Sequence, residues 1–227
     1  ILVGFAILEA WKGRDYRKQK LYAGQVPMKA GTLLCFLVFC MGAQMINSLW
    51  ITFLELLLAL FGKSILPVLE MVAGSSDTFS MFFYASILAP LWEELVFRGY
   101  ILRTLQPYGK RFAILGSALL FGLFHGNLLQ TPYAILMGLL FGYVTVEYSI
   151  GWAVALHMFN NLIISDMLSR LTYDMNMVLS SLIQSGVIYG FAIAGIILAI
   201  VLLFPIPMRL KDGGTVKYQA VLYSISD

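Results

Sequence analysis

The stretch LAPLWEELVFRGY (residues 88–100) places two adjacent glutamates and an arginine, Glu93, Glu94 and Arg98, inside an otherwise apolar run. The run covers about residues 79–105, which exceeds the ~20 residues that a helix needs to cross a bilayer. An ionisable side chain at the centre of such a helix costs a few kcal/mol and marks a candidate functional site. The stretch therefore predicts a transmembrane helix that carries chemistry or a structural charge cluster.

The composition of the whole chain indicates a membrane protein. Of its 227 residues, 60% are hydrophobic and only 12% are charged, about half of the ~25% that a soluble domain carries. Several runs of 18 or more residues hold no charge, as is typical of transmembrane helices. The net charge of +3 does not indicate a nucleic-acid partner, because the basic residues lie in short loops between apolar runs. We expect membrane lipid as a partner instead.

The apolar runs predict an all-α fold, a polytopic bundle of about seven transmembrane spans. We expect a single integral-membrane domain over residues 1–227, with its core at about residues 80–170. The opening segment ILVGFAILEAW has no methionine and is too short to span, so we take it as the end of an earlier helix in a longer protein. The other six spans are expected from Ala30 and at about 79–105, 112–127, 133–148, 152–169 and 178–204.

The basic residues predict the orientation of these spans. If the loop 12–29 is cytoplasmic, strict alternation puts the loop 103–111 and the C-terminal tail on the same side. Twelve of the 15 lysines and arginines then lie inside, Lys63 and Arg170 lie outside, and Arg98 lies within the membrane. This distribution follows the positive-inside rule. We therefore expect a multi-pass protein with these three segments in the cytoplasm.

The spacing of the three charges in the opening stretch divides them into two groups. Glu94 and Arg98 are one helical turn apart and suit an ion pair, whereas Glu93 is offset by about 100°. The spacing predicts that Glu94 and Arg98 stabilise the bundle and that Glu93 remains available for chemistry. From spacing alone, a cluster that only holds helices together is an equally good interpretation.

The two histidines favour the chemical interpretation. His125 and His157 are the only histidines, they lie in apolar segments of different predicted spans, and Asn161 follows His157 by one turn. A single histidine on an apolar helix is more often a packing residue. Here both histidines of the chain lie in predicted spans, together with an intramembrane carboxylate, and packing alone explains this less well.

Convergence of Glu93, His125, His157 and Asn161 would supply the groups that hydrolysis needs. A carboxylate and an imidazole can activate water, while a second imidazole and an amide can donate to an oxyanion. The chain has no G-x-S-x-G and no HExxH motif. Glu93, His125 and His157 could also bind zinc with an open fourth position, so a zinc site stays open as the alternative to metal-free chemistry.

Three motifs resemble a known family. EELVFR (93–98), FGLFH (121–125) and HMFNN (157–161) are similar to the EExxxR, FxxxH and HxxxN motifs of the CPBP intramembrane endopeptidases. This family groups CAAX prenyl proteases of type II with bacteriocin-processing, Abi-like proteins. The motifs occur in order, each on its own predicted helix, and the resemblance covers about residues 88–164.

The resemblance implies an intramembrane catalytic cavity and a role for each motif residue. Glu93 and His125 would activate water, and His157 and Asn161 would stabilise the oxyanion. The supporting residues would be Glu94, Arg98 and Phe121. No cofactor is required on this account. The expected substrate is a membrane-anchored or hydrophobic peptide or a lipidated protein, and the compact chain favours a prokaryotic plasma membrane.

Two other functions are compatible with the same residues. A non-catalytic protein could use the cavity to hold a peptide, for example in self-immunity against a bacteriocin. A proton-coupled transporter is less favoured, because no paired broken helices occur in corresponding halves. Outside the motifs, we expect Gly138 and Gly142 to allow close helix packing, Asn160 to pack beside the motif or support it, and Trp50 to lie at a membrane interface.

Overall fold

The computed structural model describes residues 26–69, 78–162, 168–172 and 174–203, together with positions 3, 6–7 and 10. Every regular element in these ranges is helical and none is a strand, which confirms the all-α fold. The basic loop 12–20 and the C-terminal tail from residue 204 lie outside the described residues, as does most of the opening segment. The predicted orientation depends on these segments and stays a prediction.

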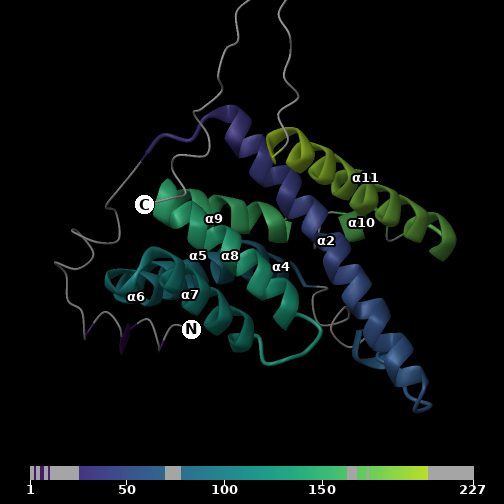
Figure 1. The fold of residues 1–227 in the computed structure, drawn as a ribbon. Helices are drawn as coiled ribbons and strands as arrows, with labels where there is room; N and C mark the ends of the chain where they lie inside the picture. Colours follow the sequence, from purple (N-terminus) through teal and green to yellow (C-terminus); the bar gives the residue numbers. More distant parts are fainter. Residues whose placement is uncertain are drawn as a thin grey trace, which may run out of the picture.

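Two long apolar helices lie side by side, α2 (Ala30–Ala59) and α11 (Met177–Leu203) (Figure 1). Their backbones approach closely at Gly42, where a Cβ atom would lie 3.2 Å from Cα of Ala192. Large apolar side chains on both helices remain exposed, including Leu49 and Leu182. Such exposure is unfavourable in water but not against lipid tails, so these surfaces fit a membrane environment.

The helix that carries the opening stretch is continuous but irregular. The backbone N–H of Ala89 donates to the carbonyl of Tyr84, five residues back, which is a wide π-type turn of the kind that occurs often at functional sites. A second wide segment follows Glu94, and Gly109 ends the run with a φ of 123°. The segments are α4 (Phe79–Phe83), η2 (Tyr84–Leu88), α5 (Ala89–Glu94), η3 (Leu95–Leu102), α6 (Arg103–Leu105) and η4 (Gln106–Tyr108).

Three shorter helices complete the part of the fold that surrounds the motifs. They are α7 (Lys110–Phe124), α8 (Thr131–Glu147) and α9 (Ile150–Phe159), and a short α10 (Leu168–Leu171) precedes α11. α7 packs along α8, and α8 packs against α9 (Figure 1). At Gly138 of α8 an added Cβ atom would lie 3.0 Å from Cα of Ala118, which confirms the predicted close packing at this glycine.

Among the described residues, three helices are long and apolar enough to cross a membrane: Ala30–Ala59, Phe79–Tyr108 and Val178–Leu198. With 15, 17 and 10 residues, α7, α8 and α9 fall short of the ~20 residues that span a bilayer. The chain is thus a helical membrane protein, and the total of seven spans stays a prediction beyond these three.

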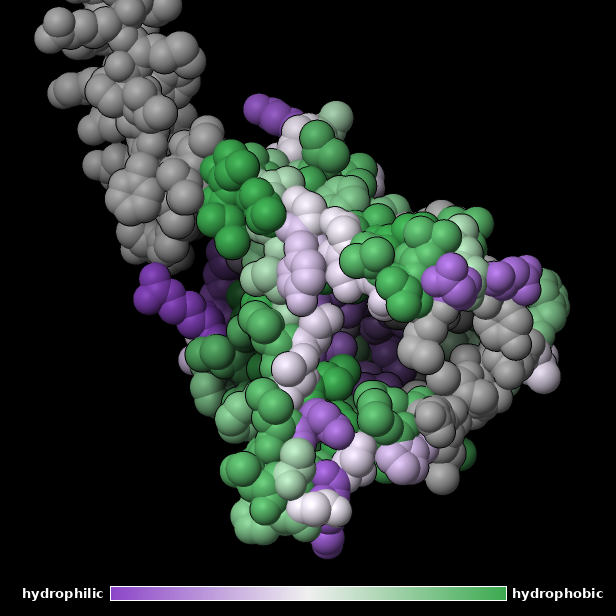
Figure 2. Space-filling model, turned by 90° about the vertical axis from the view of Figure 1, so that its right-hand side faces the viewer, coloured by the Kyte–Doolittle hydropathy of each residue, from purple (hydrophilic) through white to green (hydrophobic). Residues whose placement is uncertain are grey.

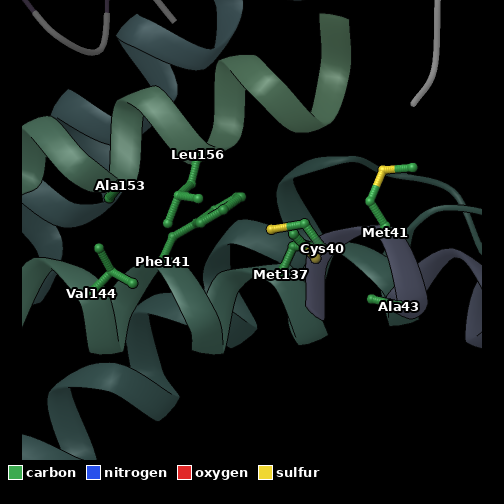
Figure 3. Close-up of a cluster of buried hydrophobic side chains, with 8 residues drawn as sticks. All are labelled: Cys40, Met41, Ala43, Met137, Phe141, Val144, Ala153 and Leu156. Atoms are coloured by element: carbon green, nitrogen blue, oxygen red, sulfur yellow. The ribbon is translucent and has the colours of Figure 1, made fainter. Parts of the chain in front are cut away.

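A compact apolar core joins α2, α8 and α9 (Figure 3). Phe141 of α8 is fully buried and lies against Leu156 of α9, and Leu156 directly precedes His157 in the chain. The Phe141 ring also stacks on the His157 imidazole, with 4.8 Å between centroids. The core therefore fixes the position of one motif histidine. Its buried members are Cys40, Met41, Ala43, Met137, Phe141, Val144, Ala153 and Leu156.

One face of the molecule is hollowed. Figure 2 shows a recess in which hydrophilic atoms lie at depth, behind a coloured surface that ranges from intermediate to hydrophobic. A polar interior behind a less polar surface is the arrangement expected where a membrane protein brings polar groups together away from lipid.

Candidate active site

Glu94 and Arg98 form a fully buried ion pair. Nη1 of Arg98 lies 3.1 Å from Oε1 of Glu94, and both side chains are 0% exposed. Arg98 also donates from Nη2 to the carbonyl of Gly138 on α8, over 3.2 Å. The ion pair expected from the i, i+4 spacing is present, and it links the motif helix to α8.

His157 lies between the two glutamates. Its Nδ1 is 2.9 Å from Oε1 of Glu94, while Nε2 is 3.8 Å from Oε2 of Glu93. Since an ionised carboxylate only accepts hydrogen bonds, Nδ1 carries a proton and donates to Glu94. Glu94 thus holds the ring in one orientation and leaves Nε2 to face Glu93. The spacing alone suggested that the two glutamates point apart, whereas they meet one imidazole from its two sides.

Two phenylalanines support this charged group. The Arg98 guanidinium lies 4.3 Å from the centroid of the Phe121 ring and 5.6 Å from that of Phe141, and such cation–π contacts are worth about 0.5–2 kcal/mol. The edge of Phe121 also meets the ring of His157, with 5.7 Å between centroids. Phe121, expected as a supporting residue, is 2% exposed and contacts the charged group directly.

His125 caps the C-terminal end of α7. Its Nδ1 lies 2.9 Å from the carbonyl oxygen of Phe121, and a carbonyl only accepts, so Nδ1 carries the proton. Nε2 of the neutral ring therefore keeps its lone pair, as a base requires. The rings of His125 and His157 both contact Phe121 edge-on, so one buried phenylalanine brings the two histidines to the same region.

Asn161 reaches the motif helix from the end of α9. Its Nδ2 donates to the carbonyl of Ala85 in η2, over 3.0 Å. Its neighbour Asn160 is 3% exposed, donates to Asn161 Oδ1 over 3.2 Å, and accepts from the hydroxyl of Tyr133 over 2.8 Å. Asn160 therefore supports Asn161. Tyr133 was not expected at the site, and no motif in the sequence indicates it.

These contacts group most of the predicted residues around His157 and Phe121. The carboxylate of Glu93 lies 3.8 Å from Nε2 of His157, and its side chain is 13% exposed. Asn161 adds an amide through its contact with η2. Among the described residues, no three or more His, Cys, Asp and Glu side chains are arranged to hold a metal ion. The arrangement offers a carboxylate base, two imidazoles and an amide donor.

A comparison with protein families matches the part of the chain that carries the three motifs. Residues 75–163 fit the model described as type II CAAX prenyl endopeptidase Rce1-like. Residues 75–163 therefore resemble an Rce1-like domain. All three motifs lie within it, so the resemblance to the CPBP endopeptidases is confirmed. Comparisons with curated proteins and with solved structures give no match.

The Rce1-like domain belongs to a family of CAAX proteases. At this coarse level the match supports a peptide hydrolase, and the apolar helices together with the family point to a membrane protein. α2 and α11, which flank the Rce1-like domain, lie outside the matched residues.

Proposed function

We propose that the chain is an intramembrane endopeptidase that hydrolyses a peptide bond of a membrane-anchored or hydrophobic peptide. The observation that carries the proposal is the position of His157, which contacts Glu94 through Nδ1 and faces Glu93 with Nε2. A structural charge cluster needs only the Glu94–Arg98 pair, whose members balance each other. Glu93 adds a second carboxylate beside the His157 imidazole, and packing alone gives no reason for it.

In the proposed reaction, Glu93 and His125 bind and polarise one water molecule. Glu93 takes a proton from the water while the water oxygen attacks the carbonyl carbon of the scissile bond. The carbonyl oxygen becomes an oxyanion, and Asn161 Nδ2 and Nε2 of a doubly protonated His157 donate to it. Collapse of the tetrahedral intermediate breaks the C–N bond, and the amine leaves with the proton that Glu93 held.

The buried ion pair has a defined part in this scheme. Glu94 accepts from Nδ1 of His157 and provides the negative charge beside a protonated ring. Arg98 balances the same carboxylate when the ring is neutral. In soluble proteases, each preorganised donor to an oxyanion, the role proposed here for His157 and Asn161, is worth about 2.7–4 kcal/mol. Glu94 and Arg98 therefore support the reaction without contacting the substrate.

The surface supports a substrate that approaches through lipid. The recess in Figure 2 holds hydrophilic atoms at depth, and hydrophobic patches lie near it on the same face, which fits a peptide that enters from the membrane with its apolar part against these patches. A lipid-modified C-terminus and an unmodified hydrophobic peptide share this chemistry. We further propose that the reaction needs no metal, and that the loops 12–29 and 103–111 face the cytoplasm of a prokaryotic cell.

The proposal is tested with the purified protein in liposomes. Hydrophobic peptides with and without a C-terminal lipid are added, and new termini are detected by mass spectrometry. We expect cleavage at one bond in at least one series, and the comparison of the two series shows whether the lipid is recognised. A protein that binds these peptides but cleaves none would instead be a peptide-binding membrane protein.

A further inference from the structure

A continuous hydrogen-bond relay crosses four helical segments and ends on Asn161. It begins on α2, where Gln44 Nε2 donates to Tyr133 Oη over 2.8 Å. Tyr133 Oη donates to Asn160 Oδ1 over 2.8 Å, and Asn160 Nδ2 donates to Asn161 Oδ1 over 3.2 Å. Asn161 Nδ2 then donates to the carbonyl of Ala85 over 3.0 Å. Gln44 lies outside the matched residues 75–163.

We propose that this relay fixes which end of the Asn161 amide faces the reaction, so that Tyr133 and Asn160 are positioning residues for the oxyanion donor. The inference rests on the proposed function. It adds α2 to the site, because Gln44 supplies the first donor.

The links of the relay all run in one direction, because the last one ends on the Ala85 carbonyl, which can only accept. A primary amide donates only from nitrogen and accepts only at oxygen. Because Gln44 gives its hydrogen to the Tyr133 oxygen, the hydroxyl proton of Tyr133 is free for Asn160 Oδ1. Asn160 is thereby turned with Nδ2 toward Asn161, which must present its Oδ1 in return. The direction is fixed at the Ala85 carbonyl, which can only accept. Gln44, Tyr133 and Asn160 hold Asn161 in the same orientation from the other end.

The direction matters because the Asn161 amide has two different ends. Nδ2 carries two hydrogens, and one of them is used by the carbonyl of Ala85. The second hydrogen is available to an oxyanion. In the reversed orientation, Oδ1 would face both the Ala85 carbonyl and the oxyanion, and three acceptors would repel one another. Only one orientation of Asn161 can stabilise the transition state.

The backbone supplies the end point of the relay. In the wide turn of η2, Ala89 donates to Tyr84, so the next bond in the same pattern would run from residue 90 to Ala85. Residue 90 is a proline and has no N–H. The carbonyl of Ala85 is thus left for Asn161. Asn160 is 3% exposed, so water competes little with the relay at its central link.

The test is the variant Tyr133→Phe, assayed for kcat, KM and thermal unfolding. Oxyanion stabilisation acts in the transition state and not in substrate binding. We therefore expect kcat to fall about tenfold or more, part of the ~100–1000-fold loss seen when an oxyanion donor is removed, with KM unchanged. The matched control is Tyr143→Phe, the same change on α8 at a residue that is 38% exposed, and it should keep the wild-type kcat.

A double-mutant cycle separates a positioning role from a merely structural one. If Tyr133 acts through Asn161, the double variant Tyr133→Phe/Asn161→Ala has the kcat of Asn161→Ala alone. The inference would be overturned if the loss of kcat in the double variant equals the product of the two single losses. It would also be overturned if Asn161→Ala keeps the wild-type kcat. If Tyr133→Phe does not fold, Asn160→Leu takes its place in the same cycle with the same expectation.

The outcome is distinguishable from failure of the proposed function. Glu93→Gln is measured beside the cycle. Retained cleavage by Glu93→Gln would reject the proposed mechanism. Lost cleavage by Glu93→Gln, with independent effects of Tyr133→Phe and Asn161→Ala, would reject only the relay.

Discussion

Nδ1 of His157 lies 2.9 Å from Oε1 of Glu94, a hydrogen bond between an imidazole and a carboxylate that is 0% exposed. The same oxygen lies 3.1 Å from Nη1 of Arg98. One buried atom therefore balances an arginine and orients a histidine. Glu94 connects the stability of the bundle to the geometry of the candidate active site, and each side of that connection can be tested.

Arg98→Met should destabilise the protein strongly. The variant keeps much of the side-chain volume but leaves Glu94 as a buried charge without its arginine. Breaking a buried pair in this way costs about 3–5 kcal/mol, which we expect as a large fall in Tm during thermal unfolding in detergent. Lys110→Met is the matched control, because Lys110 pairs with Glu147 where both side chains are partly exposed. A pair of that kind is worth at most about 1 kcal/mol, so equal falls in Tm would contradict the account.

Gly138→Ala should separate α7 from α8. The added Cβ atom would lie 3.0 Å from Cα of Ala118, and the carbonyl of Gly138 is the acceptor for Arg98. Overpacking of this kind costs about 1–3 kcal/mol, measured as a lower Tm. Gly186→Ala on α11 is the control, because its Cβ would meet no atom within 4 Å and alanine favours a helix over glycine by about 1 kcal/mol. A Gly138→Ala variant as stable as Gly186→Ala would contradict the close packing.

Pro90→Ala should lower kcat without lowering stability. The new N–H at position 90 would compete with Asn161 for the carbonyl of Ala85, while removal of a proline from a helix interior is favourable. We expect kcat to fall about tenfold, less than the ~100–1000-fold loss of a whole oxyanion donor, with an equal or higher Tm. An unchanged kcat would show that the Ala85 carbonyl does not hold Asn161.

The metal-free mechanism predicts that chelation has no effect. Activity should persist after dialysis against a strong chelator, and added zinc should not raise it. Loss of activity with the chelator and recovery with zinc would assign Glu93, His125 and His157 as metal ligands and replace the proposed water activation.

Local spacing in the sequence predicted the features that depend on a single helix or on residue size. The Glu94–Arg98 pair follows from one helical turn, and the close approach at Gly138 follows from the missing side chain. The meeting of both glutamates on His157 could not be predicted in this way. An imidazole has nitrogens on two sides, so carboxylates that leave the helix in different directions can each reach one of them.

The relay was also beyond local patterns. Gln44 and Tyr133 are 89 residues apart, and Tyr133 and Asn160 are 27 apart, so their contacts exist only in the folded bundle. One signal was available in the sequence. Pro90 lies inside an apolar helix and must leave a carbonyl without its helical donor, which predicts a polar side chain from another helix nearby. Asn161 is that side chain.

The central claim is that Glu93 activates water for peptide-bond hydrolysis. The most direct measurement is the rate constant of peptide cleavage by Glu93→Gln under single-turnover conditions, beside the affinity of the same variant for the same peptide. General-base catalysis contributes about 100–10,000-fold, so the account predicts that this rate constant falls at least ~100-fold while peptide binding is retained. Glu55→Gln, which changes a glutamate bonded to Ser64 and the backbone of Ile65, should keep full activity. Undiminished cleavage by Glu93→Gln would contradict the account.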